Sequence, residues 1–144
     1  MTGLTTQGRD ERQDAIRFCT HCGAVTDDAP QRVCPDCGLG VVLSCAREAA
    51  PAGRSPFLVV TSDLRVTAAS AATEDLFGDP GALVGRSLLD LLRGDGTLPR
   101  HVARAAMGSR RVATTWVRTH GLGRPRRARI AACGDPPAAL VVLP

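Results

Sequence analysis

The pattern of hydrophobic and polar residues is most regular in the second part of the chain, from position 57 onward. Residues 57–60 are an apolar run that predicts a buried strand. Leu64, Val66 and Ala68 then alternate with polar or small residues, which predicts a second strand in hairpin with the first across a turn at Asp63. This part of the chain therefore opens with a two-stranded antiparallel ladder.

Short helices are predicted next, and glycines mark their ends. Residues 71–77 form the first helix, which Gly78 ends. Ser87 has the spacing of a capping residue before a leucine-rich helix that would end at Gly94. Thr97 caps the third helix, whose apolar stripe consists of Leu98, Val102, Ala105 and Ala106.

Three strands complete the pattern and define the fold class. Val112, Thr114 and Trp116 alternate, and this alternation assigns Trp116 to the core. Residues 128, 130 and 132 are Ala, Ile and Ala and alternate with Arg127, Arg129 and Ala131, and residues 139–143 are a final apolar strand. The order of elements predicts an α+β fold in which a five-stranded antiparallel sheet carries short helices on one face.

The N-terminal part lacks this regularity. Residues 1–16 are polar and aperiodic, which predicts disorder. Residues 17–45, the cysteine region, contain five of the six cysteines. Residues 46–56 are rich in Ala, Pro and Gly and predict a linker to the second domain, residues 57–144.

The cysteine region carries two Cys-x-x-Cys pairs, each followed by glycine. The pairs are Cys19 with Cys22 and Cys34 with Cys37, separated by eleven residues. Two intervening residues let both sulfurs reach one ion from a tight turn, and the glycine permits the positive φ that closes it. Four thiolates suit tetrahedral Zn²⁺, so we predict a zinc-ribbon β-hairpin around one structural zinc ion. Four protein ligands leave no open position for a catalytic water.

Iron is the alternative to zinc for these four cysteines. A rubredoxin-like iron site uses the same four ligands, but such sites usually pack aromatic residues around the metal and only Phe18 is near. His21 lies inside the first pair and is interpreted as an exposed loop residue. The metal either only folds this small region or also presents the loop 24–33 to a partner. Cys45 and Cys133 are interpreted as buried inert thiols.

Composition and charge narrow the function. All 18 basic residues are Arg, a bias typical of a bacterial gene of high G+C content. Residues 97–144 hold nine Arg against Asp135 alone, which predicts a basic surface there. Its candidate members are Arg110, Arg111, Arg118, Arg124, Arg126, Arg127 and Arg129. They form either an anion-binding patch or a solvated sheet edge protected by charge.

Three segments of the second domain resemble a PAS domain. They are Phe57-Leu-Val-Val-Thr-Ser-Asp-Leu-Arg-Val-Thr, Ala71-Ala-Thr-Glu-Asp-Leu-Phe-Gly and Leu83-Val-Gly-Arg-Ser-Leu-Leu-Asp-Leu-Leu. The resemblance implies a curved five-stranded sheet with a pocket beside the helices, in which some members bind haem, flavin or small metabolites. The ligand of such a pocket is unknown here. The reactive-cysteine signature of flavin photosensors is absent, and His101 is a candidate haem ligand that could equally be a surface histidine.

The expected function follows from these parts. A zinc ribbon followed by a PAS-like domain resembles small bacterial regulatory proteins of the actinobacterial type. No catalytic motif is present, so we expect a non-catalytic signalling protein that acts through a partner protein or homo-oligomer. The N-terminus has no signal sequence and no segment suits a membrane span, which predicts a cytoplasmic protein. The alternative is a nucleic-acid-binding transcriptional regulator that uses the ribbon and the Arg-rich strands.

Overall fold

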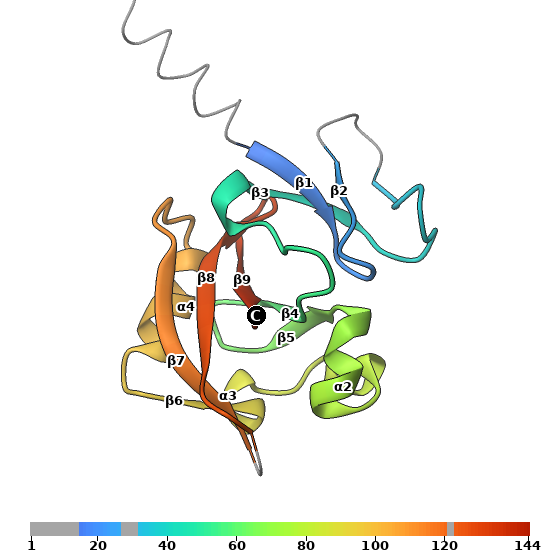
Figure 1. Ribbon diagram of the computed structural model, residues 1–144. Helices are drawn as coiled ribbons and strands as arrows, with labels where there is room; N and C mark the ends of the chain where they lie inside the picture. Colours follow the sequence, from blue (N-terminus) through green and yellow to red (C-terminus); the bar gives the residue numbers. More distant parts are fainter. Residues whose placement is uncertain (1–14, 27–31, 121–122) are drawn as a thin grey trace, which may run out of the picture.

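The computed structural model describes residues 15–26, 32–120 and 123–144. In these ranges nine strands join into one antiparallel sheet with short helices around it (Figure 1). The strands are β1 Ala15–Cys19, β2 Val25–Thr26, β3 Val42–Ala46, β4 Phe57–Val60, β5 Val66–Ala69, β6 Leu92–Gly94, β7 Ala113–Thr119, β8 Arg126–Cys133 and β9 Ala138–Val142.

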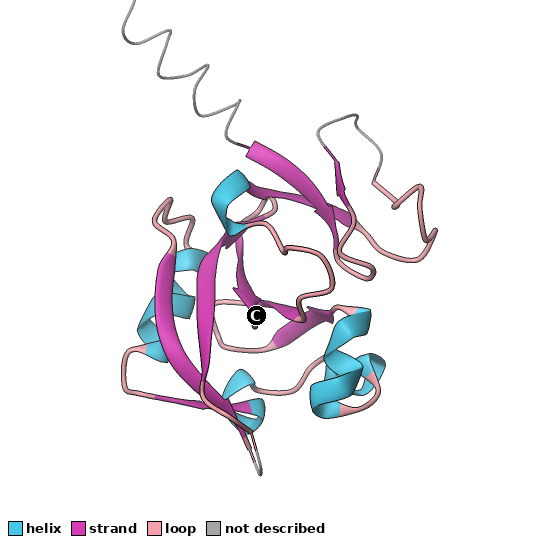
Figure 2. Ribbon diagram, in the orientation of Figure 1, coloured by secondary structure: helices cyan, strands magenta, loops and turns pink. Residues whose placement is uncertain are grey.

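Helices are short and interrupt the strands in the middle of the second domain (Figure 2). The 3₁₀ turns are η1 Arg47–Ala49, η2 Ala71–Thr73 and η3 Pro80–Leu83, and the α-helices are α2 Glu74–Phe77, α3 Leu88–Leu91 and α4 Leu98–Ala106. Within the described ranges, none of these helices has the length and apolar character needed to traverse a membrane.

The five strands predicted for the second domain are present in the order β5-β4-β9-β8-β7. The predicted sheet has too few strands, because β6 pairs with β7 and the cysteine region adds its own strands. The helix expected to reach Gly94 ends at Leu91 instead. Buried Leu92 and exposed Arg93 alternate, which suits a strand, and they pair with Thr119 and Arg118.

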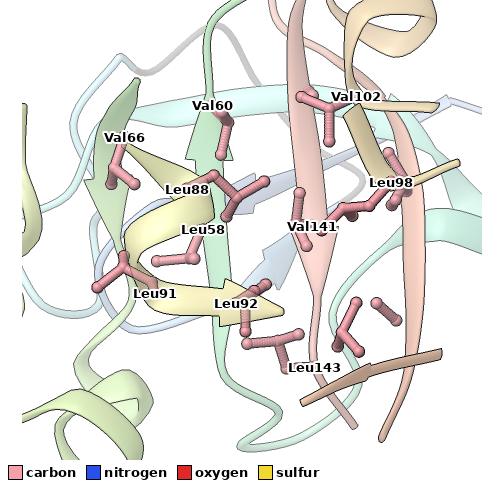
Figure 3. Packing of buried hydrophobic residues seen from close by; sticks show 14 of the residues in the cluster. Leu58, Val60, Val66, Leu88, Leu91, Leu92, Leu98, Val102, Val141 and Leu143 are labelled. Atoms are coloured by element: carbon pink, nitrogen blue, oxygen red, sulfur yellow. The ribbon is translucent and has the colours of Figure 1, made fainter. Parts of the chain in front are cut away.

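The inner face of the sheet packs against the helices and forms the main core. Ser87 Oγ accepts the N–H of Leu89 and so caps α3, as predicted. The predicted apolar stripe of α4 is buried, because α4 packs against β8 and β9. Ten of the side chains that fill this space appear in Figure 3: Leu58, Val60, Val66, Leu88, Leu91, Leu92, Leu98, Val102, Val141 and Leu143. The space where the resemblance implies a ligand pocket is thus occupied by aliphatic side chains.

The outer face of the same sheet carries a second core beneath the cysteine region. Phe57, Val59, Leu140 and Val142 point to this side, because they alternate with inner-face residues along β4 and β9. Ile16, Phe18 and Cys45 from β1 and β3 cover them, and the Phe18 and Phe57 rings meet edge to face at 5.4 Å between centroids. The cysteine region therefore shares a core with the second domain.

The segments around the cysteine region differ in part from the prediction. Ala15 and Ile16, expected in a disordered tail, belong to β1, because Ile16 supplies apolar surface to the second core. Residues 1–14 of that tail lie outside the described residues. The linker packs on the sheet: Ala49 is buried, and the N–H of Leu143 donates to the carbonyl of Pro56 at 2.8 Å.

The register of β7 corrects the prediction for Trp116. Thr115, Val117 and Thr119 are buried, whereas Trp116 is 61% exposed on the outer face. The strand starts at Ala113 rather than Val112, and its core side is shifted by one residue. The alternation of apolar residues fits either register at its start, and Val117 decides it because the core needs its aliphatic side chain.

Candidate metal centre and the basic outer face

The four predicted metal ligands come together at one end of the cysteine region. Cys19 ends β1, and its knuckle closes when the Gly23 N–H donates to the Cys19 carbonyl at 3.0 Å. The second knuckle repeats this bond between Gly38 and Cys34 at 2.9 Å. Both glycines have positive φ, +77° and +71°, as the motif requires. The two knuckles are thus matching turns that face each other.

The sulfur geometry suits a tetrahedral ion. All four Sγ atoms lie within 4.8 Å of one another. The Sγ atoms of Cys19 and Cys37 are 3.6 Å apart, and those of Cys22 and Cys34 are 3.7 Å apart. A tetrahedron with metal–sulfur bonds of about 2.3 Å has edges of about 3.8 Å. The residues present therefore fit one metal ion, and these four cysteines could hold it.

Backbone N–H groups surround the sulfurs and favour the thiolate form. The N–H groups of His21 and Cys22 donate to Cys19 Sγ at 3.3 and 3.4 Å and act to lower its pKa, but burial outweighs them and raises the pKa of Cys19, as it does that of Cys22. The N–H of Leu39 donates to Cys37 Sγ at 3.5 Å, and with that of Gly40 it lowers the pKa of Cys37 to about 6. His21 contributes its backbone to this arrangement, and its ring is not one of the clustered donors found in the described ranges.

Gly40 is a part of the four-cysteine centre that the knuckle pattern did not predict. A Cβ at this position would lie 2.2 Å from Cys19 Sγ and 2.8 Å from His21 Cβ. Only glycine lets the chain after the second knuckle pass this close to the first. The signal in the sequence was a third glycine, two residues after Gly38, which the knuckle pattern alone does not require.

The metal centre is attached to the second domain through its first knuckle. The N–H of Ala71 donates to the carbonyl of His21 at 2.7 Å, and Gly23 lies beside Phe57, since a Cβ at Gly23 would be 3.5 Å from that ring. Folding of the knuckle therefore fixes groups that belong to the outer-face core. Residues 27–31 of the loop 24–33 lie outside the described residues.

The other two cysteines form the junction between β3 and β8. Cys45 and Cys133 are register partners there, and both are buried. Burial raises the pKa of each thiol to about 12, so both stay protonated at neutral pH. The interpretation of both as buried thiols agrees with this placement.

The seven arginines of the predicted basic surface do not all share one site. Arg129 Nη1 donates to the carbonyl of Glu48 at 2.9 Å, so this side chain holds the linker on the sheet. Arg126 Nη1 donates to the carbonyl of Pro144 at 3.1 Å. Arg110 and Arg111 are exposed in the segment before β7, and Arg124 is exposed in the β7–β8 connection.

Arg118 and Arg127 remain together on the outer face, around Trp116. Trp116 is the register partner of Arg127, and Arg118 is the partner of Arg93 on β6. Arg93 was not among the predicted members of the basic surface, because it was expected in a helix. All three arginines are exposed.

His101 lies on α4 and is partly buried. Its neighbours on the helix, Leu98 and Val102, are fully buried in the inner core. Hydrogen bonds from Thr97 lower the pKa of Asp95, and the charge of His101 acts in the same direction. The structure therefore brings His101 near a carboxylate, and its role as a haem ligand stays a prediction.

Comparisons with known proteins bear on the second domain. A family model described as PAS fold matches residues 52–133. No curated protein matches the chain. Among solved structures, the chain is similar to the PAS domain of nitrogen regulation protein NR(II) from Vibrio parahaemolyticus, with 20% identity and a TM-score of 0.48, over 62% of this chain and 86% of that one.

Proposed function

This chain belongs to the PAS fold family, and on that premise we propose that it is a non-catalytic regulatory protein that acts by binding a partner protein. PAS domains are typically sensor or regulatory modules rather than catalytic ones. The inner face of this sheet is filled by aliphatic side chains, which favours protein contacts over a ligand in the interior. The response would pass to another polypeptide or to a second copy of the chain.

A structural zinc ion in the four-cysteine centre is part of this proposal. Four thiolates with sulfur separations of 3.6 and 3.7 Å match the donor set and size that Zn²⁺ prefers. When bound, the ion would cross-link the two knuckles of a zinc ribbon, and Cys19, Cys22, Cys34 and Cys37 would fill all its positions. Metal binding would thus supply folding free energy to a region too small to form its own core.

The observation that carries the proposed function is an exposed apolar surface beside the metal centre. Leu39 is 75% exposed, and Val41 and Val84 are more than half exposed. These three side chains line a groove of about 530 Å³ between the cysteine region and the β5–η3 segment. Because the second knuckle carries Leu39, the metal positions one wall of this groove. A partner protein with an apolar segment would gain affinity by covering these side chains.

Capture of partners with the full, zinc-loaded chain tests this proposal. The protein would be immobilised and exposed to extract from its native cells, in parallel with a Leu39→Asp variant. A charged residue in the groove should abolish partner binding, because covering it would require desolvating a carboxylate. Size-exclusion chromatography of the same proteins would report whether the partner is a second copy.

The matched control is Met107→Asp. Met107 is 81% exposed after α4 and is not a lining residue of the groove, so this variant introduces the same charge and removes a similar apolar surface. We expect at least one protein that is captured by the unchanged chain and by Met107→Asp but is not captured by Leu39→Asp. Equal recovery of every captured protein by all three would refute it.

A further inference from the structure

The outer face of β6, β7 and β8 carries the one tryptophan of the chain among arginines. Trp116 lies directly opposite Arg127, and Arg118 lies two residues further on the same face of β7, opposite Arg93. Opposite residues of an antiparallel pair have Cβ atoms about 5 Å apart, so backbone spacing places these three arginines within roughly 10 Å of Trp116.

This arrangement is unfavourable in the free protein. Trp116 leaves 61% of its side chain in water, although it is the largest side chain and the core is short of aromatic residues. Like charges on neighbouring strands repel each other, and here Arg93 and Arg118 are direct register partners. An anionic ligand with a flat apolar surface would relieve both costs at once.

A cleft at this place has suitable dimensions and lining. Its volume is about 380 Å³, and its walls include Arg93, Trp116, Arg118 and His120. Asp95 also lines it, and its carboxylate accepts the N–H of Thr97 at 2.9 Å, which holds it against the backbone but leaves it negatively charged. The three arginines nevertheless outnumber this one acid on the face. A planar base would have Trp116 as a stacking partner, with guanidinium groups on adjacent strands for the phosphates.

The geometry points to this face as a binding site for single-stranded nucleic acid, in which Trp116 stacks on one base and Arg93, Arg118 and Arg127 contact phosphates. This goes beyond the partner-protein role proposed above and uses a different surface. A duplex keeps its bases stacked internally, where the indole does not reach them. An acidic peptide would pair with the arginines but would offer no flat base to stack on the Trp116 indole.

The sole tryptophan makes the binding directly observable. The zinc-loaded full chain would be titrated with labelled single strands of thymidylate or uridylate of about 12 nucleotides, within the range of known single-strand sites. Stacking should quench the Trp116 fluorescence, and anisotropy of the label should rise to saturation. DNA and RNA strands form separate arms, because phosphates and bases are common to both. A duplex and a polyglutamate of equal length complete the comparison.

Variants separate stacking from charge. Trp116→Ala should weaken binding roughly 5- to 150-fold, the range measured for loss of one stacked base, and Trp116→Phe should recover part of it. With three phosphate contacts, the slope of log affinity against log salt should be about −2, so affinity falls roughly 20-fold between about 50 and 200 mM salt. Arg118→Gln should reduce that slope to about −1.4.

Arg104→Gln is the matched control. Arg104 is exposed on α4, which packs on the inner side of the sheet, so its loss changes the net charge equally and should leave the salt slope unchanged. The inference fails if no oligonucleotide binds at low salt, or if Trp116→Ala binds like the unchanged protein. It also fails if the duplex or polyglutamate binds as tightly as the single strands, because binding would then not depend on exposed bases.

Discussion

The outer face of the sheet is covered at one end and open at the other, and strand β8 passes through both regions. At its C-terminal end, Ala131 and Cys133 point outward beneath the cysteine region and are buried. At its N-terminal end, Arg127 points to the same side and is exposed next to Trp116. Arg129 lies between the two regions and holds the linker at their boundary.

The difference shows how one strand can serve two purposes. Small apolar side chains let β1 and β3 approach and complete a core, whereas buried arginines would need partners for every charge. The position of the cysteine region thus depends on residues in two places: the apolar residues of β1 and β3 and the outward residues of β8. The uncovered region keeps exposed charged and aromatic side chains, on which the proposed nucleic-acid site rests.

The largest expected effect comes from removing one metal ligand. Cys34→Ala should release the metal and unfold the cysteine region, because the buried Cys34 supplies one of four donors. Loss of the cover would expose Phe57, Val59 and Leu140 to water. We expect no stoichiometric zinc by elemental analysis and a strong increase in the fluorescence of a hydrophobic dye.

The control for this change is Cys45→Ala. Cys45 is also a buried cysteine of the same region, but its thiol is not among the clustered donors. The variant should lose some stability and keep its zinc. Zinc retained by Cys34→Ala, or lost equally by both variants, would contradict the assignment of the four ligands.

A smaller effect distinguishes two aromatic residues of the same face. Phe57→Ala should lower the free energy of unfolding by about 3–5 kcal/mol, because the fully buried ring packs against Phe18 beneath the cover. Trp116→Ala in the open region should change it by less than about 0.5 kcal/mol. Urea unfolding followed by circular dichroism measures both. Similar losses of stability for the two variants would mean that Trp116 is packed in a core and that this end of the outer face is not uncovered.

The sequence was sufficient for much of the fold because local signals agree with the packing there. Three signals each indicate one buried face or one helix boundary: the apolar run at residues 57–60, the Ser87 cap and the apolar stripe of α4. The predicted register of β7 was wrong because Val112, Thr114 and Trp116 alternate as regularly as Thr115, Val117 and Thr119 do, and only packing decides which set is buried. Strand β6 was missed because three residues are too few for a periodic signal.

The candidate sites divide in the same way. The clustering of the four cysteines was predictable because the spacing of the two Cys-x-x-Cys pairs by itself brings the sulfurs together. The need for glycine at Gly40 depends on a close approach between two loops, which only the folded chain shows. The arginine-rich ending was evident, but the separate roles of Arg129 and Arg127 depend on which carbonyl groups the linker brings near.

The smallest expected effect tests the boundary between the two regions. Arg129 donates to the carbonyl groups of Glu48 and Ala50 at 2.9 and 3.4 Å, whereas Arg127 stands two residues away beside Trp116. Arg129→Met removes both hydrogen bonds and keeps the aliphatic stem, so it should cost about 1–2 kcal/mol of unfolding free energy. Arg127→Met should cost less than about 0.5 kcal/mol. Amide hydrogen exchange at the linker should also become faster in Arg129→Met and not in Arg127→Met, because Arg129 fixes the linker against β8. Unchanged protection of the linker amides in Arg129→Met would mean that the outer-face core and the metal hold the cysteine region without these two hydrogen bonds.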